Sequence, residues 1–227
     1  MDVLFDFTPV FDNMGDILQA FWAVIRLTVT TGILSLILGT ILAGMRVAPV
    51  RIFRGAGTLY VNVFRNTPLT LILAFCALGL SDTLHISLST QSTVNFYWLA
   101  VFGLAAYTAA FICEALRSGI NTVPLGQAEA ARAVGLTFFQ SLRLVILPQA
   151  FRSVIAPLGS IFIAMTKNTT VVIVASYVES AYIMRQLFEE EGATIPMFLA
   201  FAIGFMIITL PMGFFFGWLA KRLAVSR

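Results

Sequence analysis

Charge, histidine and cysteine are all scarce in this sequence. Only 11% of its 227 residues are Asp, Glu, Lys or Arg, whereas soluble domains carry about 25%. One histidine, His85, and two cysteines, Cys76 and Cys113, offer no cluster of the usual zinc ligands, so we expect no metal site. The patterns GxxxxGK(S/T), GxSxG and HExxH are also absent, so we expect the chain neither to bind ATP itself nor to be an enzyme.

What the sequence has instead is long apolar runs. Hydrophobic residues make up 59% of the chain, and its mean hydropathy is +0.93. About 20 consecutive apolar residues are enough to cross the hydrocarbon core of a bilayer. We therefore expect an all-α integral membrane protein that forms a single domain over the whole chain. Its five predicted transmembrane helices lie at residues 17–45, 56–81, 96–116, 153–176 and 195–220.

The few charges are sorted by sign between the predicted loops. Ten basic residues fall on one side of the predicted membrane: Arg46, Arg51, Arg54, Arg117, Arg132, Arg143, Arg152, Lys221, Arg222 and Arg227. The opposite loops hold Arg185 and nine acidic residues: Asp2, Asp6, Asp12, Asp16, Asp82, Glu179, Glu189, Glu190 and Glu191. Because basic loops stay in the cytoplasm, we expect the N-terminus outside and the C-terminus inside. Basic residues spread over separate loops also argue against nucleic acid as a partner.

One segment between two spans, residues 121–150, is polar and contains signals for two short helices. Asn121 or Thr122 can cap the first of these helices, and Gly135 can end it. Thr137 can cap the second helix. The simplest interpretation is an amphipathic helical hairpin that lies on the membrane surface.

The same segment also holds a motif of fixed spacing, made of Glu129, Ala130, Ala131, Gly135, Leu147 and Pro148. In residue type, in spacing and in position between two spans, this motif resembles the cytoplasmic loop of the permease subunits of ATP-binding-cassette (ABC) importers. That loop reads EAA, three residues, G, and later I-x-LP or close to it. The resemblance implies a type I ABC importer permease fold, in which this loop docks on a separate ATPase subunit.

Charged residues inside the predicted spans are unusual, because each costs at least about 2.5–3.5 kcal/mol on insertion scales. We interpret Arg26 as structural, either reaching to the outer surface or paired with a neighbouring helix. Arg65 lies eleven residues beyond Arg54, which places it about 16 Å into the membrane at 1.5 Å per residue. Glu114 lies one turn before Arg117, so it is explained either by an ion pair between the two or by a role as a gate or as a contact to a substrate amine.

Two of the predicted spans carry polar interruptions. The second span is interrupted by Arg65, Asn66, Thr67 and Pro68, and the fourth span by Lys167, Asn168, Thr169 and Thr170. Thr followed by Pro is typical of a helix start, so we expect a half-helix near Pro68 whose free N–H groups attract an anion. Paired interruptions at membrane depth indicate a substrate site. We therefore take Arg65, Asn66, Thr67, Glu114, Lys167, Asn168 and Thr169 as candidate substrate-binding residues, with a structural tie as the alternative for Lys167.

The resemblance covers essentially the whole chain and is closest to the polar amino acid branch of the importer family. Within that branch, the strings RNTPLTL, ALRSGINTV, GQAEAARAVGL and TKNTT look most like permeases of glutamate importers. This implies a multi-pass protein of a prokaryotic plasma membrane that imports glutamate or aspartate. Another polar amino acid, such as glutamine or a basic amino acid, is the alternative substrate.

The resemblance also implies partners. These are an ABC ATPase dimer that holds ATP and Mg²⁺, a second permease chain that is identical or homologous, an extracytoplasmic solute-binding protein, and membrane lipid. This chain itself is expected to bind no cofactor. Two other classes of protein compete with this interpretation. An ion-driven secondary transporter would also have broken helices but would not need the cytoplasmic motif, and a purely structural membrane subunit would not explain Arg65.

Overall fold

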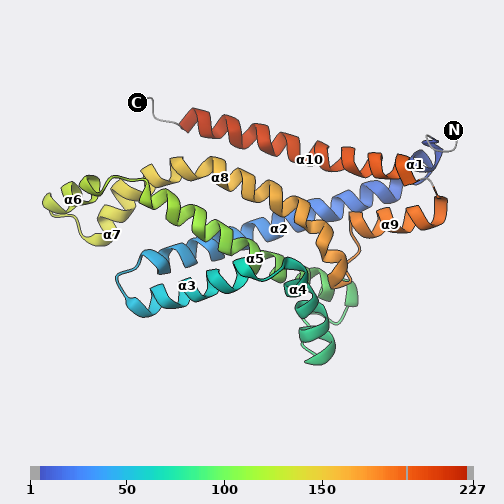
Figure 1. Ribbon diagram of the computed structural model, residues 1–227, viewed down its shortest axis with the longest axis horizontal. Coiled ribbons are helices and arrows are strands. Elements are labelled where there is room, and N and C mark those ends of the chain that lie inside the picture. The colour runs from blue at the N-terminus through green and yellow to red at the C-terminus, as the bar shows by residue number, and fades with distance from the viewer. Residues whose placement is uncertain (1–5, 193, 224–227) are drawn as a thin grey trace.

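The computed structural model describes residues 6–192 and 194–223, and the regular secondary structure in these two ranges is all helical (Figure 1). The expected all-helical secondary structure is thus confirmed for the described residues. Elements η2 and η3 are π-helical and η4 is a 3₁₀ helix. In chain order the elements are α1 (Thr8–Asp12), α2 (Met14–Val47), α3 (Arg51–Asn66), α4 (Leu69–Ala74), η2 (Phe75–Thr83), α5 (Ser92–Asn121), α6 (Leu125–Ala133), α7 (Phe138–Ser141), η3 (Leu142–Ile146), α8 (Leu147–Asn168), η4 (Thr169–Ala175), α9 (Ser180–Glu191) and α10 (Thr194–Leu223).

Among the described residues, four helical stretches are each long and apolar enough to cross a membrane: α2, α5, Phe138–Ala175 and α10. A fifth span results if α3 and the stretch Leu69–Thr83 are counted together, which gives the number expected from the sequence. The axes of these two parts differ by 102°. Thr67 and Pro68 both have extended backbone at the bend, as expected for a proline and for the residue before it. The predicted break in the second span is therefore confirmed.

Helix α5 lies at the centre of the bundle and contacts α2, α3, α4 and α8. Its buried face is rich in small residues, which allow neighbouring helices to approach closely. Close approach matters in a membrane because helices there associate through van der Waals packing rather than through the hydrophobic effect. One tight contact involves Gly39 of α2, where a Cβ atom would lie 2.7 Å from Cγ2 of Ile112 in α5. A larger residue at position 39 would push α2 away from α5 at this point.

The predicted polar segment between spans is only partly separate from the bundle. Gly135 has a φ of +88° and follows α6, and Thr137 forms a capping box with Gln140, so both of these expectations are confirmed. The prediction that Asn121 or Thr122 caps the first of the two helices is wrong, because α5 extends to Asn121 and no side chain caps α6. The second helix is also not separate, since α7 continues through η3 into α8.

The reason for this continuity lies in the position of Pro148. Pro148 is the second residue of α8, which directly follows η3, so the change of helix type lies beside the residue that lacks an N–H donor. The preceding residues adopt the wider π-helical turn of η3 rather than ending the helix. The fourth span therefore starts inside the segment that we predicted to be cytoplasmic.

The two ends of the bundle, which Figure 1 shows at its right and left, differ in the charged residues that they carry. What we call the acidic end holds α1, α9 and the start of α10, and its exposed carboxylates include Asp12, Glu189 and Glu191. The basic end holds α6, α7, the loop between α2 and α3, and the end of α10. The first and last described residues thus lie at opposite ends. Helix α9, which lies between two spans, was not predicted.

Candidate functional site

Four charged side chains from three helices form one cluster around Glu114. Arg46 of α2 donates a hydrogen bond from Nη1 to Oε1 of Glu114. Arg117 of α5 donates from Nη2 to Oε2 of the same carboxylate at 3.3 Å. Nη1 of Arg65 in α3 lies 3.9 Å from Oε1. The expected pair between Glu114 and Arg117 is present, but Arg46 is a partner that the sequence analysis assigned to a loop.

The direction of helical side chains explains why these residues meet. Cα–Cβ bonds tilt toward the N-terminus of their own helix. Helices α2 and α5 run from the acidic end to the basic end, and α3 runs the opposite way (Figure 1). The side chains of Arg46 and Glu114 therefore lean toward the acidic end, and the side chain of Arg65 leans back toward them. The guanidinium of Arg65 therefore lies closer to the basic end than its own backbone does.

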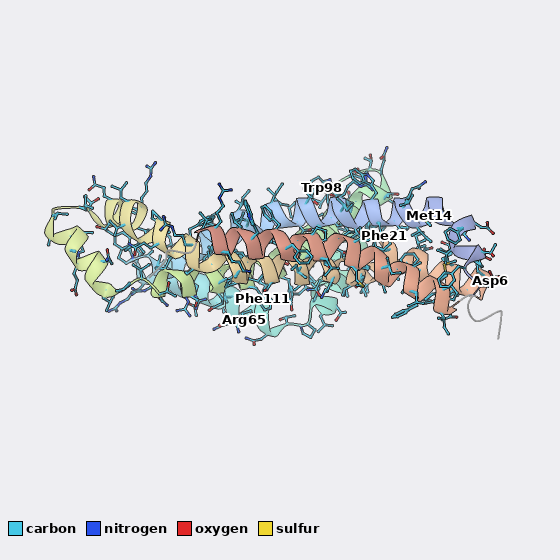
Figure 2. The ribbon with its side chains drawn as sticks, turned by 90° about the horizontal axis from the view of Figure 1, so that it is seen from above. Asp6, Met14, Phe21, Arg65, Trp98 and Phe111 are labelled. Carbon is cyan, nitrogen blue, oxygen red and sulfur yellow. The ribbon has the colours of Figure 1, made fainter. Side chains whose placement is uncertain are left out.

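Exposure distinguishes the members of this cluster. The side chain of Arg46 is 11% exposed and that of Glu114 is 24% exposed, whereas that of Arg65 is 48% exposed. Arg65 thus has the longest contact with Glu114 and the greatest access to the surroundings (Figure 2). The cluster carries three cations and one carboxylate, so it has an excess of positive charge.

The predicted interruption of the fourth span is also present. Helix α8 ends at Asn168 and continues as the 3₁₀ helix η4, which ends at Ser176 with a left-handed backbone. Thr169 is buried, and its hydroxyl donates to the carbonyl oxygen of Thr166 at 2.8 Å. The side chain of Lys167 is exposed and pairs with no carboxylate in the part of the chain that the structure describes.

The two interruptions are neighbours in space although they are far apart in the sequence. Helix α4, which begins directly after Pro68, contacts η4, which begins directly after Asn168. Leu69 and Leu73 of α4 share one hydrophobic cluster with Val172 of η4. At the first interruption, the side chains turn back onto α3. The Asn66 amide donates to the carbonyl oxygen of Asn62, and the Thr67 hydroxyl donates to that of Val63.

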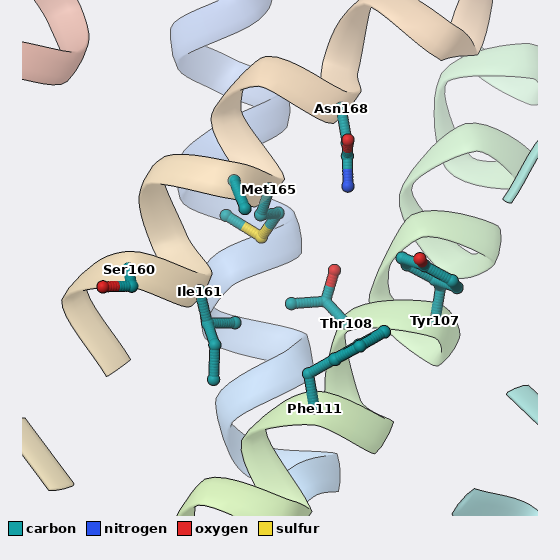
Figure 3. Close-up of a pocket in the computed structure, with 8 residues that line it drawn as sticks. Tyr107, Thr108, Phe111, Ser160, Ile161, Met165 and Asn168 are labelled. Carbon is teal, nitrogen blue, oxygen red and sulfur yellow. The ribbon is translucent and has the colours of Figure 1, made fainter. Parts of the chain in front are cut away.

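A pocket of about 250 Å³ lies between α5 and α8, next to the second interruption (Figure 3). Figure 3 shows the Asn168 amide pointing from the end of α8 toward the side of the pocket formed by Tyr107 and Thr108. The volume is below the range of roughly 300–1,000 Å³ that is common for drug-sized ligands, so it suits a small solute. The sequence analysis missed Tyr107 and Thr108, because single polar groups inside an apolar run give no signal of their own.

The pocket and the charged cluster follow one another along α5. Phe111 lines the pocket and lies three residues before Glu114, which is a rise of about 4.5 Å along the helix. Tyr107 lies one further turn away on the same side of the helix. The candidate site therefore combines a small, partly polar pocket with fixed positive charge at its basic end.

The predicted coupling motif is largely accessible. Glu129, Ala130 and Gly135 are exposed, whereas Ala131 is only 6% exposed and faces the rest of the chain. Leu147 and Pro148 are exposed at the start of α8. Glu129 does not pair with Arg132 among the described residues, so the ion pair considered as an alternative is not formed. Large apolar side chains are exposed beside the motif, with Leu125 at 82% and Val134 at 77%.

A buried carboxylate lies at the acidic end, outside the predicted spans. Glu179 is 0% exposed and caps α9 by accepting a hydrogen bond from the Ala181 N–H at 2.8 Å. The Ser180 hydroxyl donates to its other oxygen at 2.6 Å. Burial outweighs these bonds and raises the pKa of Glu179 to about 7. The sequence analysis placed this residue among solvated loop acids, since its burial follows only from how η4 and α9 pack.

The raised pKa of Glu179 predicts a dependence of stability on pH. A carboxyl that is easier to protonate when folded contributes stability that is fully present below its unfolded pKa of about 4.5 and is lost as pH rises through about 7. We expect the thermal unfolding temperature of the purified protein to fall by several degrees between pH 5 and pH 8. Glu179→Gln should remove most of this fall. An equally steep fall in the variant would show that another group is responsible.

Comparison with known proteins gives the family. Residues 35–225 match the family described as the binding-protein-dependent transport system inner membrane component. The glutamate transport system permease protein GluC of Corynebacterium efficiens is 48% identical over 217 residues, which cover 93% of this chain and 95% of that protein. The glutamate/aspartate import permease protein GltK of Escherichia coli is 31% identical, with 97% of this chain and 99% of that protein covered.

The fold has a solved counterpart. A crystal structure of an amino acid ABC transporter with histidines matches with a TM-score of 0.84 at 24% identity, covering 96% of this chain and 98% of that chain. The chain therefore belongs to the family of binding-protein-dependent transport system inner membrane components. It is a multi-pass membrane subunit of a transport system rather than an enzyme, and the expected ABC permease fold is confirmed.

Proposed function

We propose that this chain is the permease subunit of an ATP-driven importer of glutamate, with aspartate as a related substrate. The observation that carries this proposal is the excess positive charge beside the pocket, where three guanidinium groups surround one carboxylate. A solute that enters with carboxylates and meets fixed cations gains attraction that a neutral solute does not. The relatives named for glutamate transport, at 47–48% identity, support the same substrate.

Within this proposal, Arg65 binds the carboxylate of the substrate, because it is the exposed cation of the cluster and its planar fork suits a carboxylate. Lys167 adds a second positive charge at the other interruption. Asn168 and Tyr107 offer polar groups to the rest of the solute. The sequence analysis also considered a contact between Glu114 and the amine of the substrate. In the structure such an amine would have to compete with three arginines for the carboxylate of Glu114.

The proposed assembly contains an ABC ATPase dimer that binds and hydrolyses Mg-ATP, a second permease chain, and a solute-binding protein on the outer side. The exposed part of the EAA motif supports the contact with the ATPase, because Glu129, Ala130 and the neighbouring Leu125 and Val134 are exposed in the described chain. The family description supports the binding protein. We place the basic end in the cytoplasm, as the positive-inside rule requires.

Lys167→Ala tests the charge of the substrate. Removing a fixed cation removes attraction only from a solute that carries the opposite charge, so initial uptake of glutamate should fall about threefold to tenfold more than uptake of glutamine. The measurement is the initial rate for each labelled amino acid, corrected for the amount of assembled complex. An equal reduction for both solutes would mean that Lys167 is structural, and it would remove the residue-level support for an acidic substrate.

The orientation has a separate test. Leu125 and Leu88 are 82% and 47% exposed and lie in loops that we place on opposite sides of the membrane. A cysteine introduced at Leu125 should react with a membrane-impermeant reagent only from the cytoplasmic side, and one at Leu88 only from outside. The natural cysteines Cys76 and Cys113 are buried and should contribute little background. Reaction of both sites from one side would contradict the five-span arrangement.

A further inference from the structure

Glu114 is shared unequally by its three arginine partners. Arg46 is nearly buried and makes the closest contact, and Arg117 donates a hydrogen bond to the other carboxylate oxygen. Arg65 lies 3.9 Å from Oε1, at the outer limit of an ion pair, and its side chain is about half exposed. Among the three, Arg65 is therefore the partner that is most easily withdrawn from the carboxylate.

Withdrawing Arg65 leaves no buried charge without a partner. Glu114 would keep Arg46 and Arg117, one at each oxygen. This matters because an uncompensated buried charge is strongly unfavourable, whereas an exchange of partners is not. Arg65 would in turn need a new anion as its partner. A substrate carboxylate can take this place, because it is the same chemical group as the side chain of Glu114.

From this geometry we propose that Glu114 is an internal competitor of the substrate carboxylate. It holds Arg65 when the site is empty, and Arg65 moves from Glu114 to the side-chain carboxylate of the substrate when an acidic amino acid binds. The inference rests on the proposed role of Arg65 in substrate binding. Glu114 is then a positioning residue, since it acts on the substrate through Arg65.

The location of Arg65 gives the exchange a structural consequence. Arg65 lies two residues before Thr67, where the chain bends by 102° between α3 and α4. In the empty site its pair with Glu114 links α3 to α5 directly at this bend. Binding of the side-chain carboxylate of an acidic amino acid removes this ion pair next to the break, while the other contacts between α3 and α5, such as the hydrogen bond from the Tyr60 hydroxyl to the carbonyl oxygen of Ala106, remain. Glutamine has an amide in place of that side-chain carboxylate, so it gives Arg65 no such partner and leaves the ion pair in place.

Equilibrium binding of labelled glutamate tests the proposal directly. The sample is the complete permease–ATPase complex in lipid nanodiscs without the binding protein, so that the Kd reports on the permease. Glu114→Gln keeps the size and a hydrogen-bond acceptor for Arg46 and Arg117 but removes the competing charge. We expect its Kd for glutamate to be about twofold to fivefold lower than that of the wild type, the range of a partly exposed ion pair. The Kd for glutamine should stay the same.

Whether the Kd for glutamate falls, rises or stays the same in Glu114→Gln distinguishes the possible roles of Glu114. A higher Kd for glutamate would indicate that Glu114 itself contacts the substrate, and an unchanged Kd that it is only structural; either result would overturn the proposal. Glu189→Gln is the matched control, because Glu189 pairs with Arg185 at 2.9 Å on the exposed face of α9. This control should leave the Kd for glutamate unchanged.

Two further variants keep the test decisive. Glu114→Asp retains the charge for Arg46 and Arg117, and with it assembly, but withdraws the carboxylate from Arg65, so its Kd should also fall. In an Arg65→Ala background, Glu114→Gln should have no effect on the Kd.

If Arg65→Ala alone binds glutamate like the wild type, the proposed role of Arg65 fails. If Arg65→Ala loses binding but neither Glu114 variant tightens it, only the competition fails.

Discussion

Replacing Arg65 with alanine is expected to reduce glutamate uptake about 100-fold or more. Each hydrogen bond to a charged group contributes about 1.5–3 kcal/mol, and a guanidinium donates two of them to one carboxylate. Arg65→Lys keeps the charge but loses the fork, so we expect a smaller reduction of about tenfold. The measurement is the initial uptake rate, normalised to the amount of assembled complex.

Arg54→Ala is the matched control for this experiment. Arg54 lies on the same helix, is exposed, and pairs with no carboxylate among the residues that the structure describes. Its replacement should leave uptake near the wild-type rate. If Arg65→Ala transports as fast as this control, the substrate does not pass Arg65, and the site proposed between α3, α5 and α8 is wrong.

Changing the motif proposed to contact the ATPase is expected to abolish uptake without preventing insertion into the membrane. Gly135 has a φ of +88°, which proline cannot adopt, and its N–H donates to the carbonyl oxygen of Arg132 at 3.0 Å. Gly135→Pro should deform the end of α6 and reduce uptake at least about tenfold. Glu129→Arg reverses an exposed charge of the same motif and should have a similar effect. Either variant should release the ATPase or let it hydrolyse ATP without transport.

The control for the motif is Gly126→Ala. Gly126 lies in the same short helix, has no unusual backbone angle, and has open space where a Cβ would be added. This substitution should leave both uptake and co-purification of the ATPase intact. Normal uptake together with normal ATPase recovery in Gly135→Pro and Glu129→Arg would refute the assignment of this loop to coupling.

Local sequence rules predicted the features that depend on neighbouring residues. Pro68 forces itself and the residue before it into extended backbone, so the break in the second span was predictable. The positive φ of Gly135 and the capping box at Thr137 follow from equally local preferences. The change of helix type at Asn168 was predictable as an interruption, although its 3₁₀ geometry was not.

The features that depend on packing could not be predicted in this way. Arg46 lies at the end of α2, where its charge is typical of a loop, and only the packing of α2 against α5 brings it to Glu114. The burial of Glu179 depends on how α9 packs beside η4, elements that are not apparent from hydropathy alone. The continuity of α7 with α8 was not predicted, because it depends on the π-helical turn of η3 that precedes Pro148.

The central claim is that this chain forms the path of an ATP-driven importer for an acidic amino acid. It is tested most directly by uptake of labelled glutamate into proteoliposomes that contain this chain with its ATPase, its permease partner and its binding protein. We predict uptake that requires ATP and is competed by glutamate and aspartate far better than by glutamine or arginine. Uptake that an ion gradient drives without ATP, or that arginine and glutamate compete equally well, would contradict the account.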